Sequence, residues 1–175
     1  MKICYYKLIL ITQKLNKDFC EYASFLKICI QNGVTCVQLR EKSLDNKSLL
    51  CLALKIKKFL YPFKIPFIIN DNIELALHIN ADGLHLGQED GSVFYARKLL
   101  GPNKILGLTV NSFEQIEKAN DFPIDYIGVG AIFYTKNKPN IQKIWGCKVN
   151  SSSKCNFINI EGITQGKRTY TNNVI

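Results

Sequence analysis

Short apolar runs alternate with helix-like segments along the first 130 residues, and this alternation constrains the fold more than any other feature. Each apolar run has the length of a strand, and each segment between two runs carries apolar residues at helical spacing. Such an alternation predicts a parallel sheet with helices on the outside. The predicted strands cover residues 7–12, 35–39, 66–69, 83–86, 104–109 and 125–129, and the predicted helices cover residues 18–32, 45–60, 73–79, 92–100 and 112–120.

Local signals mark several of these boundaries. Gly33 follows the first predicted helix, where a residue with a left-handed backbone often ends a helix. Pro62 stops the second helix, and Gly101 closes the fourth. Ser112 and Gln115 have the spacing of a capping box at the start of the fifth helix.

Polar residues gather at or just after the carboxyl ends of the predicted strands. A doubly wound sheet would share the alternation, but this rim of polar residues favours a barrel, because (β/α)-barrels carry their active sites there. The sequence therefore predicts an α/β fold of the TIM (β/α)8-barrel type. The rim residues occupy positions 38–42, 70–71, 88–90, 109 and 135–138.

The pattern changes after Pro139. Residues 157–160 are expected to form a seventh strand beside residues 125–129, whereas residues 164–175 are polar and no sequence follows for an eighth strand. We therefore expect an incomplete barrel of six to seven strands, with residues 1–146 as its main body and residues 147–175 as a degenerate, poorly ordered segment. An open sheet edge favours aggregation or a homo-oligomer that covers it.

Composition excludes several function classes. The net charge is +9, but residues 138–175 hold six basic residues and one acidic residue, and no basic stripe with interleaved aromatics suggests nucleic-acid binding. No apolar run approaches the roughly 20 residues of a membrane span. Residues 8–11 are too short for a signal segment, so we expect a cytoplasmic protein. The seven cysteines are scattered without a CxxC pair, and most are expected to be reduced core residues.

Two acidic residues follow successive predicted strands, Asp71 and Asp90. Carboxylate oxygens of this kind suit Mg²⁺, which binds one or two carboxylates together with substrate phosphates. The simpler interpretation of each is a helix N-cap, which is the commoner role of an aspartate after a strand.

Cations and amides occur on the same rim. Arg40, Lys42 and Lys138 suit phosphate oxygens, while Gln38 and Asn70 suit the edge of a heteroaromatic ring. Together with the carboxylates they describe a pocket for a magnesium-bound pyrophosphate on a polar ring. Each residue also has a plain structural interpretation: a solvated Arg40–Glu41 pair, a solvated Lys138, and His85, between two leucines, as a packed core histidine.

Four stretches resemble the motifs of thiamine phosphate synthases, in that family's order. They are VQLREK at 37–42, PFIIND at 66–71, ADGLHLGQED at 81–90 and DYIGVG at 125–130, and the resemblance covers roughly residues 5–146. It implies a transferase that joins 4-amino-2-methyl-5-(diphosphooxymethyl)pyrimidine to thiazole phosphate, giving thiamine phosphate and pyrophosphate with the help of Mg²⁺. The implied partners are therefore small phosphorylated molecules.

The resemblance also assigns roles by position, although none of the residues is implied to be a covalent or acid–base catalyst. The pyrimidine pyrophosphate would be bound by Gln38, Leu39, Arg40, Glu41, Lys42, Asn70, Thr109 and Lys138. The thiazole phosphate would be bound by Thr135, Lys136, Asn137 and Gly162, and Mg²⁺ by Asp71 and Asp90.

The chain departs from the family pattern near the thiazole phosphate. The loop at 130–138 lacks two prolines and a second threonine, and Glu161 stands where the family has glycine. We therefore expect the pyrimidine half of the site to be better preserved than the thiazole half. Two alternatives stay open: a non-catalytic remnant of the barrel, and a thiazole tautomerase-like relative. That relative usually lacks the pyrophosphate and metal residues and has a histidine near the position of Asn111.

Overall fold

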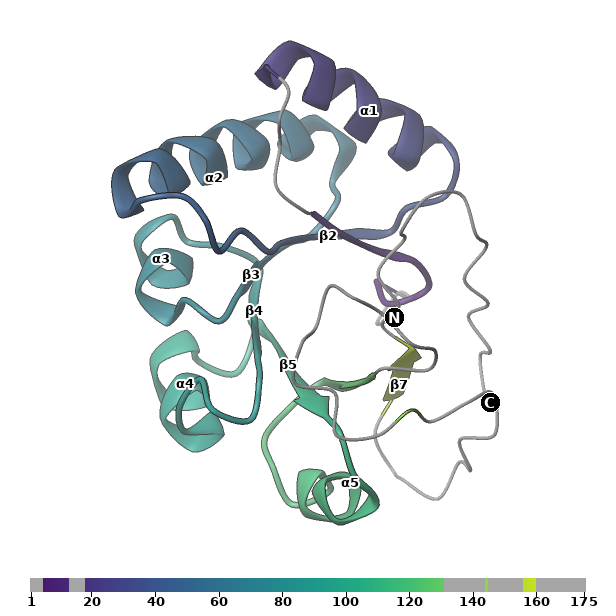
Figure 1. The fold of residues 1–175 in the computed structure, drawn as a ribbon, viewed down its shortest axis with the longest axis vertical. Coiled ribbons are helices and arrows are strands. Elements are labelled where there is room, and N and C mark those ends of the chain that lie inside the picture. The colour runs from purple at the N-terminus through teal and green to yellow at the C-terminus, as the bar shows by residue number, and fades with distance from the viewer. Residues whose placement is uncertain (1–4, 13–17, 131–143, 145–155, 160–175) are drawn as a thin grey trace. The chain divides into compact units, whose positions relative to one another are not determined.

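The computed structural model describes residues 5–12, 18–130, 144 and 156–159 (Figure 1). The chain forms two compact units, Met1–Leu84 and His85–Ile175. Among the described residues, none of the helices combines the length and the apolar composition that crossing a membrane requires.

The first unit contains three strands that pair in parallel and in chain order: β1 (Ile9–Ile11), β2 (Cys36–Leu39) and β3 (Phe67–Asn70). Leu10 pairs with Val37, and Val37 pairs with Phe67. Helices α1 (Phe19–Gln31) and α2 (Asn46–Leu60), which lie on the same side of these strands, form the crossovers between them (Figure 1). The short helices η1 (Tyr61–Phe63) and α3 (Ile73–His78) precede and follow β3.

The second unit repeats this arrangement. Strand β4 (Gly83–Leu86) spans the boundary and is followed by α4 (Val93–Leu100), β5 (Ile105–Val110), α5 (Phe113–Ala119), β6 (Tyr126–Val129) and β7 (Asn156–Asn159). Strands β5, β6 and β7 pair in parallel and in chain order. Strand β7 lies within one residue of the strand expected at 157–160, and it pairs with β6 as expected.

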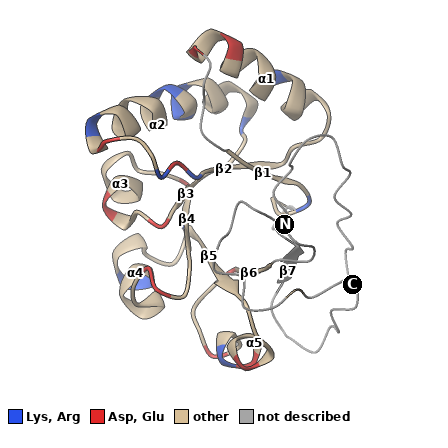
Figure 2. Cartoon of the chain, in the orientation of Figure 1, with Lys and Arg blue, Asp and Glu red and all other residues tan. Residues whose placement is uncertain are grey.

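The elements predicted for the first 130 residues are all present, with boundaries displaced by at most two residues. Strands β2, β4 and β6 are buried at every position. Among the described residues, Lys, Arg, Asp and Glu lie on helices and connecting segments, and none lies on a strand (Figure 2). Burial along a whole strand is typical of a parallel sheet that is covered on both faces.

Local signals act largely as predicted. Gly33 has a φ of +99°, and the N–H of Val34 reaches back to the carbonyl of Cys29 to close α1. Ser112 caps α5 by accepting a hydrogen bond from the N–H of Gln115. The capping box is incomplete, however, because the Gln115 side chain accepts from the N–H of Asn111 at 2.6 Å, one residue before the expected partner.

The expectation for the cysteines is wrong for Cys20 and Cys51, which are exposed on α1 and α2. Both occupy outward positions that the apolar spacing of these helices leaves to solvent. Cys36 is buried as expected, and burial raises the pKa of its thiol above the ordinary value.

Three pairs of reciprocal hydrogen bonds join neighbouring strands at their amino ends. Each pair joins two residues: one directly precedes an even-numbered strand, and the other lies at or next to the start of the preceding odd-numbered strand. The first residue donates its N–H to the carbonyl of the second. The side-chain oxygen of the first residue accepts the N–H of the second. The pairs are Thr35 with Leu8, Asp82 with Phe67, and Asp125 with Leu106, at 2.8 to 3.0 Å. We call these the strand-start links, and they fix which residues of the two strands lie side by side.

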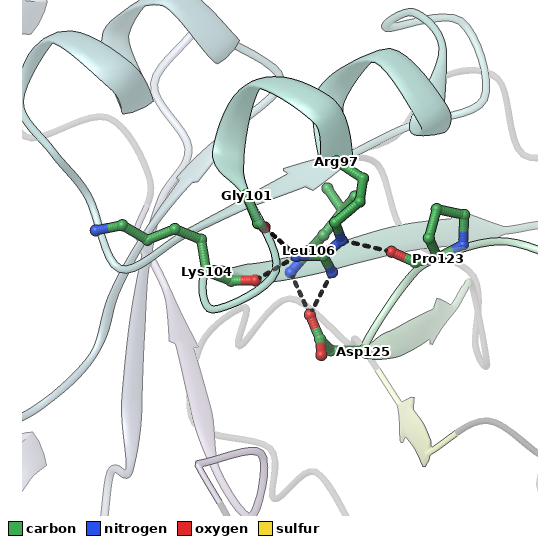
Figure 3. Close-up of polar contacts among 6 residues, drawn as sticks. All are labelled: Arg97, Gly101, Lys104, Leu106, Pro123 and Asp125. Carbon is green, nitrogen blue, oxygen red and sulfur yellow. Dashed lines mark hydrogen bonds and ion pairs between the residues drawn. The ribbon is translucent and has the colours of Figure 1, made fainter.

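The third strand-start link is reinforced by Arg97 of α4. Its guanidinium donates to the Asp125 carboxylate at 2.7 Å and to the carbonyls of Gly101, Lys104 and Pro123 at 2.7 to 3.0 Å (Figure 3). The Arg97 side chain is 16% exposed, so water replaces these contacts poorly if they are lost. Arg97 therefore fastens α4 to the loops before β5 and β6.

Replacement of Arg97 should destabilise the fold. Arg97→Lys keeps the positive charge but loses the planar fork that reaches several acceptors, and we expect a loss of about 2–3 kcal/mol in the free energy of unfolding. Denaturant unfolding followed by circular dichroism measures this loss. Lys98→Ala, at the next and exposed position of α4, is the control and should change stability by about 0.5 kcal/mol or less. Equal stability of the two variants would contradict the role assigned to Arg97.

Candidate active site

The carboxyl ends of β2 and β3 bring the first group of predicted residues together. Leu39 pairs with Ile69, so the segments that follow the two strands leave the sheet side by side. Gln38 is buried and 1% exposed, and Leu39 is buried beside it, while Arg40 and Asn70 are half-buried where the chain emerges. The ends of these two strands therefore bring Gln38, Arg40 and Asn70 to the same edge of the sheet, and their binding roles stay predictions.

The segment after β2 is held by two side chains. The N–H of Arg40 donates to the Thr12 hydroxyl at 3.1 Å, which joins it to the end of β1. The Glu41 carboxylate accepts from both the N–H and the hydroxyl of Ser43, at 3.0 and 2.7 Å. Glu41 therefore stabilises its own loop through Ser43. The sequence had also allowed a solvated pair between Glu41 and Arg40.

Lys42 and Asp71 meet across the two strand ends. Lys42 Nζ lies 2.9 Å from Asp71 Oδ2, and the two side chains are 62% and 25% exposed. An ion pair in this setting contributes little to stability, because water and salt screen it. The pair places a cation and an anion together at the ends of β2 and β3. The lysine could bind a phosphate there, and the aspartate could bind a metal ion.

The N-cap interpretation is wrong for Asp71. Helix α3 is capped by Asn72, whose side chain accepts the N–H of Leu75 at 2.8 Å. Asp71 instead has a φ of +64°, a left-handed conformation that is uncommon outside glycine and that aspartate tolerates. Residues held in this region are often found where function requires a particular side-chain direction.

The N-cap interpretation is also wrong for Asp90. Helix α4 is capped by Ser92, and Asp90 Oδ2 accepts the N–H of Gly87 at 2.6 Å. A Cβ atom at Gly87 would lie 2.6 Å from the same oxygen, closer than real contacts allow. Glycine at position 87 therefore lets the Asp90 carboxylate fold back onto the turn after β4.

Thr109 lies in a hydrogen-bonded group within the second unit. Its hydroxyl is 2.8 Å from Nε2 of His85, whose Nδ1 is 2.8 Å from the Tyr126 hydroxyl. Its carbonyl accepts from the Gln88 side chain at 2.5 Å. His85 is buried in the core, as predicted, but its two polar partners were not predicted from the sequence. The sequence feature that could have indicated these partners is the presence of a polar residue on each of three successive strands.

Several predicted residues lie outside the described part of the chain: Thr135, Lys136, Asn137, Lys138 and Gly162. Asp71 and Asp90 belong to different units, so the prediction that they bind one magnesium ion together stays a prediction. The described residues contain no group of three or more His, Cys, Asp or Glu side chains that would hold a metal ion by themselves. A magnesium ion bound by one or two carboxylates and a pyrophosphate needs no such group.

Comparison with known proteins identifies the family of this chain. Residues 8–167 match the family model described as thiamine monophosphate synthase. The chain belongs to that family. The thiamine-phosphate synthase of Chlamydia caviae is 47% identical over 142 residues, which are 81% of this chain and 67% of the relative. The thiamine-phosphate synthase of Clostridium acetobutylicum is 45% identical over 145 residues, covering 82% of this chain and 68% of the relative.

A solved structure confirms the predicted fold class. The thiamine phosphate pyrophosphorylase of Pyrococcus furiosus aligns with a TM-score of 0.75 and 26% identity, over 91% of this chain and 76% of that one. The family fold is α/β of the TIM-barrel type, as predicted from the strand–helix alternation together with the polar residues at the strand ends. Barrels of this type carry their active sites at the carboxyl ends of their strands, and the residues described above lie at such ends within each unit.

The environment of Asp71 predicts that this residue serves function rather than folding. Asp71→Asn should keep the unfolding free energy within about 0.5 kcal/mol, because the ion pair is partly exposed and asparagine accepts a left-handed backbone. Asp71→Val should lose about 1–2 kcal/mol, because a branched side chain is strained at this φ. Chemical denaturation of both variants measures the difference. A loss in Asp71→Asn as large as in Asp71→Val would show that the carboxylate itself stabilises the fold.

Proposed function

We propose that the chain joins 4-amino-2-methyl-5-(diphosphooxymethyl)pyrimidine to thiazole phosphate, producing thiamine phosphate and pyrophosphate. The observation that carries the proposal is the Lys42–Asp71 pair, which sets a cation and a carboxylate 2.9 Å apart where two neighbouring strands end. Buried Gln38 and half-buried Asn70 belong to the same two strands and offer amide groups for the edge of a pyrimidine. The 47% identity to a thiamine-phosphate synthase supports the same reaction.

The proposed reaction breaks one bond and forms one bond. The bond between the pyrimidine methylene carbon and the pyrophosphate oxygen breaks, and its electron pair leaves with the pyrophosphate. The aminopyrimidine delocalises the positive charge left on the methylene. The thiazole nitrogen then donates its electron pair to that carbon. No covalent intermediate with the protein is required, so the protein contributes position and charge.

Each residue of the rim has a part in this scheme. Lys42 and Arg40 stabilise negative charge as it develops on the leaving pyrophosphate. Gln38, Asn70 and Thr109 hold the pyrimidine, and residues 135–138 with Gly162 would hold the thiazole phosphate and the far side of the pyrophosphate. Leu39 and Glu41 shape the segment between strand and loop, by packing and by the Ser43 hydrogen bonds.

A magnesium ion fits this set of residues. Asp71 and Asp90 supply hard carboxylate oxygens at strand ends, and neither is used as a helix cap. Both would hold the ion together with the pyrophosphate of the substrate. When bound, the ion neutralises charge on the leaving group.

The cysteines bear on the compartment in which the protein acts. Cys20, Cys29, Cys36 and Cys51 are free thiols, as expected of a reducing compartment, and we place the protein in the cytoplasm. A homo-oligomer stays a prediction. The barrel remnant without activity and the tautomerase-like relative are disfavoured by the preserved Lys42, Asp71 and Asp90 positions.

Synthesis of thiamine phosphate tests the proposal directly. The purified chain, given both substrates and Mg²⁺, should release pyrophosphate and thiamine phosphate in equal amounts, measured by chromatography. Lys42→Ala should lower kcat/KM about 100-fold, because a charge that stabilises the leaving group is removed. Lys47→Ala, an exposed lysine near the start of α2, is the control and should keep full activity. Absence of product, or equal rates in the two variants, would contradict the proposal.

A further inference from the structure

His85 connects two hydroxyl groups within the second unit. It is 2% exposed, with Nδ1 2.8 Å from the Tyr126 hydroxyl and Nε2 2.8 Å from Thr109 Oγ1. We propose that His85 is a positioning residue for the transferase reaction: it holds the Thr109 hydroxyl so that its hydrogen points toward an acceptor atom of the pyrimidine substrate. The inference rests on the proposed function and assigns His85 and Tyr126 a part in it.

A glycine on the neighbouring strand leaves space for the Tyr126 ring beside His85. Gly107 of β5 pairs with Tyr126 of β6, and a Cβ atom at position 107 would lie 2.2 Å from Cζ of the tyrosine ring. The ring therefore occupies the space that any other side chain would fill. It stacks on His85 with a centroid distance of 5.3 Å and an interplanar angle of 30°. Gly107 and Thr109 lie two residues apart and so share one face of β5.

The chemistry of the three groups sets the direction of the hydrogen bonds. A neutral imidazole has one N–H donor and one acceptor nitrogen. A phenol is more acidic than an aliphatic alcohol, and so it is the better donor and the poorer acceptor. The favoured arrangement has the Tyr126 hydroxyl donating to Nδ1 and the Nε2–H donating to Thr109. The Thr109 oxygen then accepts from His85, and its own hydrogen points away from the ring.

Thr109 is held at its backbone as well. The Gln88 amide donates to its carbonyl at 2.5 Å, so β4 and the turn after it fix both the side chain and the main chain of this residue. Thr109 is half-buried near the carboxyl end of β5, where a ligand on the rim can meet it. A directed hydroxyl hydrogen suits a ring nitrogen of an aminopyrimidine, which accepts in the plane of the ring.

A double-mutant cycle tests whether His85 acts through Thr109. His85→Leu and Thr109→Val should each raise the KM for the pyrimidine pyrophosphate about tenfold, and the double variant should be no worse than either. His85→Gln, which keeps an N–H donor directed at Thr109, should recover most of the loss. His78→Gln, at an exposed position of α3, is the control and should match the unchanged chain. Additive losses would overturn the inference while leaving the proposed function intact.

Nitrogen NMR of the histidines tests the hydrogen-bond direction without reference to activity. The chain has two histidines, so loss of a signal in His78→Gln assigns the other to His85. We expect neutral His85 with its proton on Nε2, and a shift of that proton toward Nδ1 in Tyr126→Phe. A proton on Nδ1 in the unchanged chain, or a Tyr126→Phe spectrum identical to it, would overturn the inference. If the unchanged chain makes no product, the proposed function fails, and the positioning role fails with it.

Discussion

The strand-start links are the constraint on which the candidate site depends. In each link, the residue before an even-numbered strand exchanges two hydrogen bonds with the start of the strand before it. A register error of one residue would turn every side chain of the shifted strand to the opposite face. Because the register is fixed at the amino ends of two neighbouring strands, the residues at their carboxyl ends also lie side by side. Leu39 lies beside Ile69, and Thr109 lies beside Gly128.

The polar groups at the strand ends lower the stability of the fold, and contacts elsewhere in each unit offset this loss. Asp71 holds a left-handed backbone, and Asp90 needs a glycine three residues before it. The buried apolar strands and the Arg97 contacts stabilise the surrounding structure and keep these groups in place. Groups positioned before substrate arrives need little reorganisation as charge develops on a leaving pyrophosphate, and this is the main contribution a protein can make to such a reaction.

The sequence predicted the elements well because their signals are local. Apolar spacing and caps lie within each segment, so α2 and β4 could be located from their own residues. The role of Asp71 was harder to predict, because Asp71 and Asn72 are both good caps and the choice depends on a backbone angle. The partners of His85 are 24 and 41 residues away along the chain, so they become evident only once the strands are paired.

The contacts of Arg97 illustrate the same limit. Its acceptors come from the end of its own helix and from the loops before β5 and β6, up to 28 residues away. An arginine in a helix otherwise resembles any solvated basic residue, and nothing in its neighbours along the chain distinguishes it from Lys98. Long-range polar contacts of this kind require the fold to be known first.

Calorimetric titration can show whether the proposed site binds a pyrimidine pyrophosphate together with a divalent ion. With Mg²⁺ present, the pyrimidine pyrophosphate should bind at one saturable site. Removal of the ion with a chelator should weaken binding at least about tenfold, because the carboxylates and the pyrophosphate would then repel each other. Equally tight binding without the ion, or saturable binding of thiazole phosphate with none of the pyrimidine pyrophosphate, would show that the proposed site is wrong.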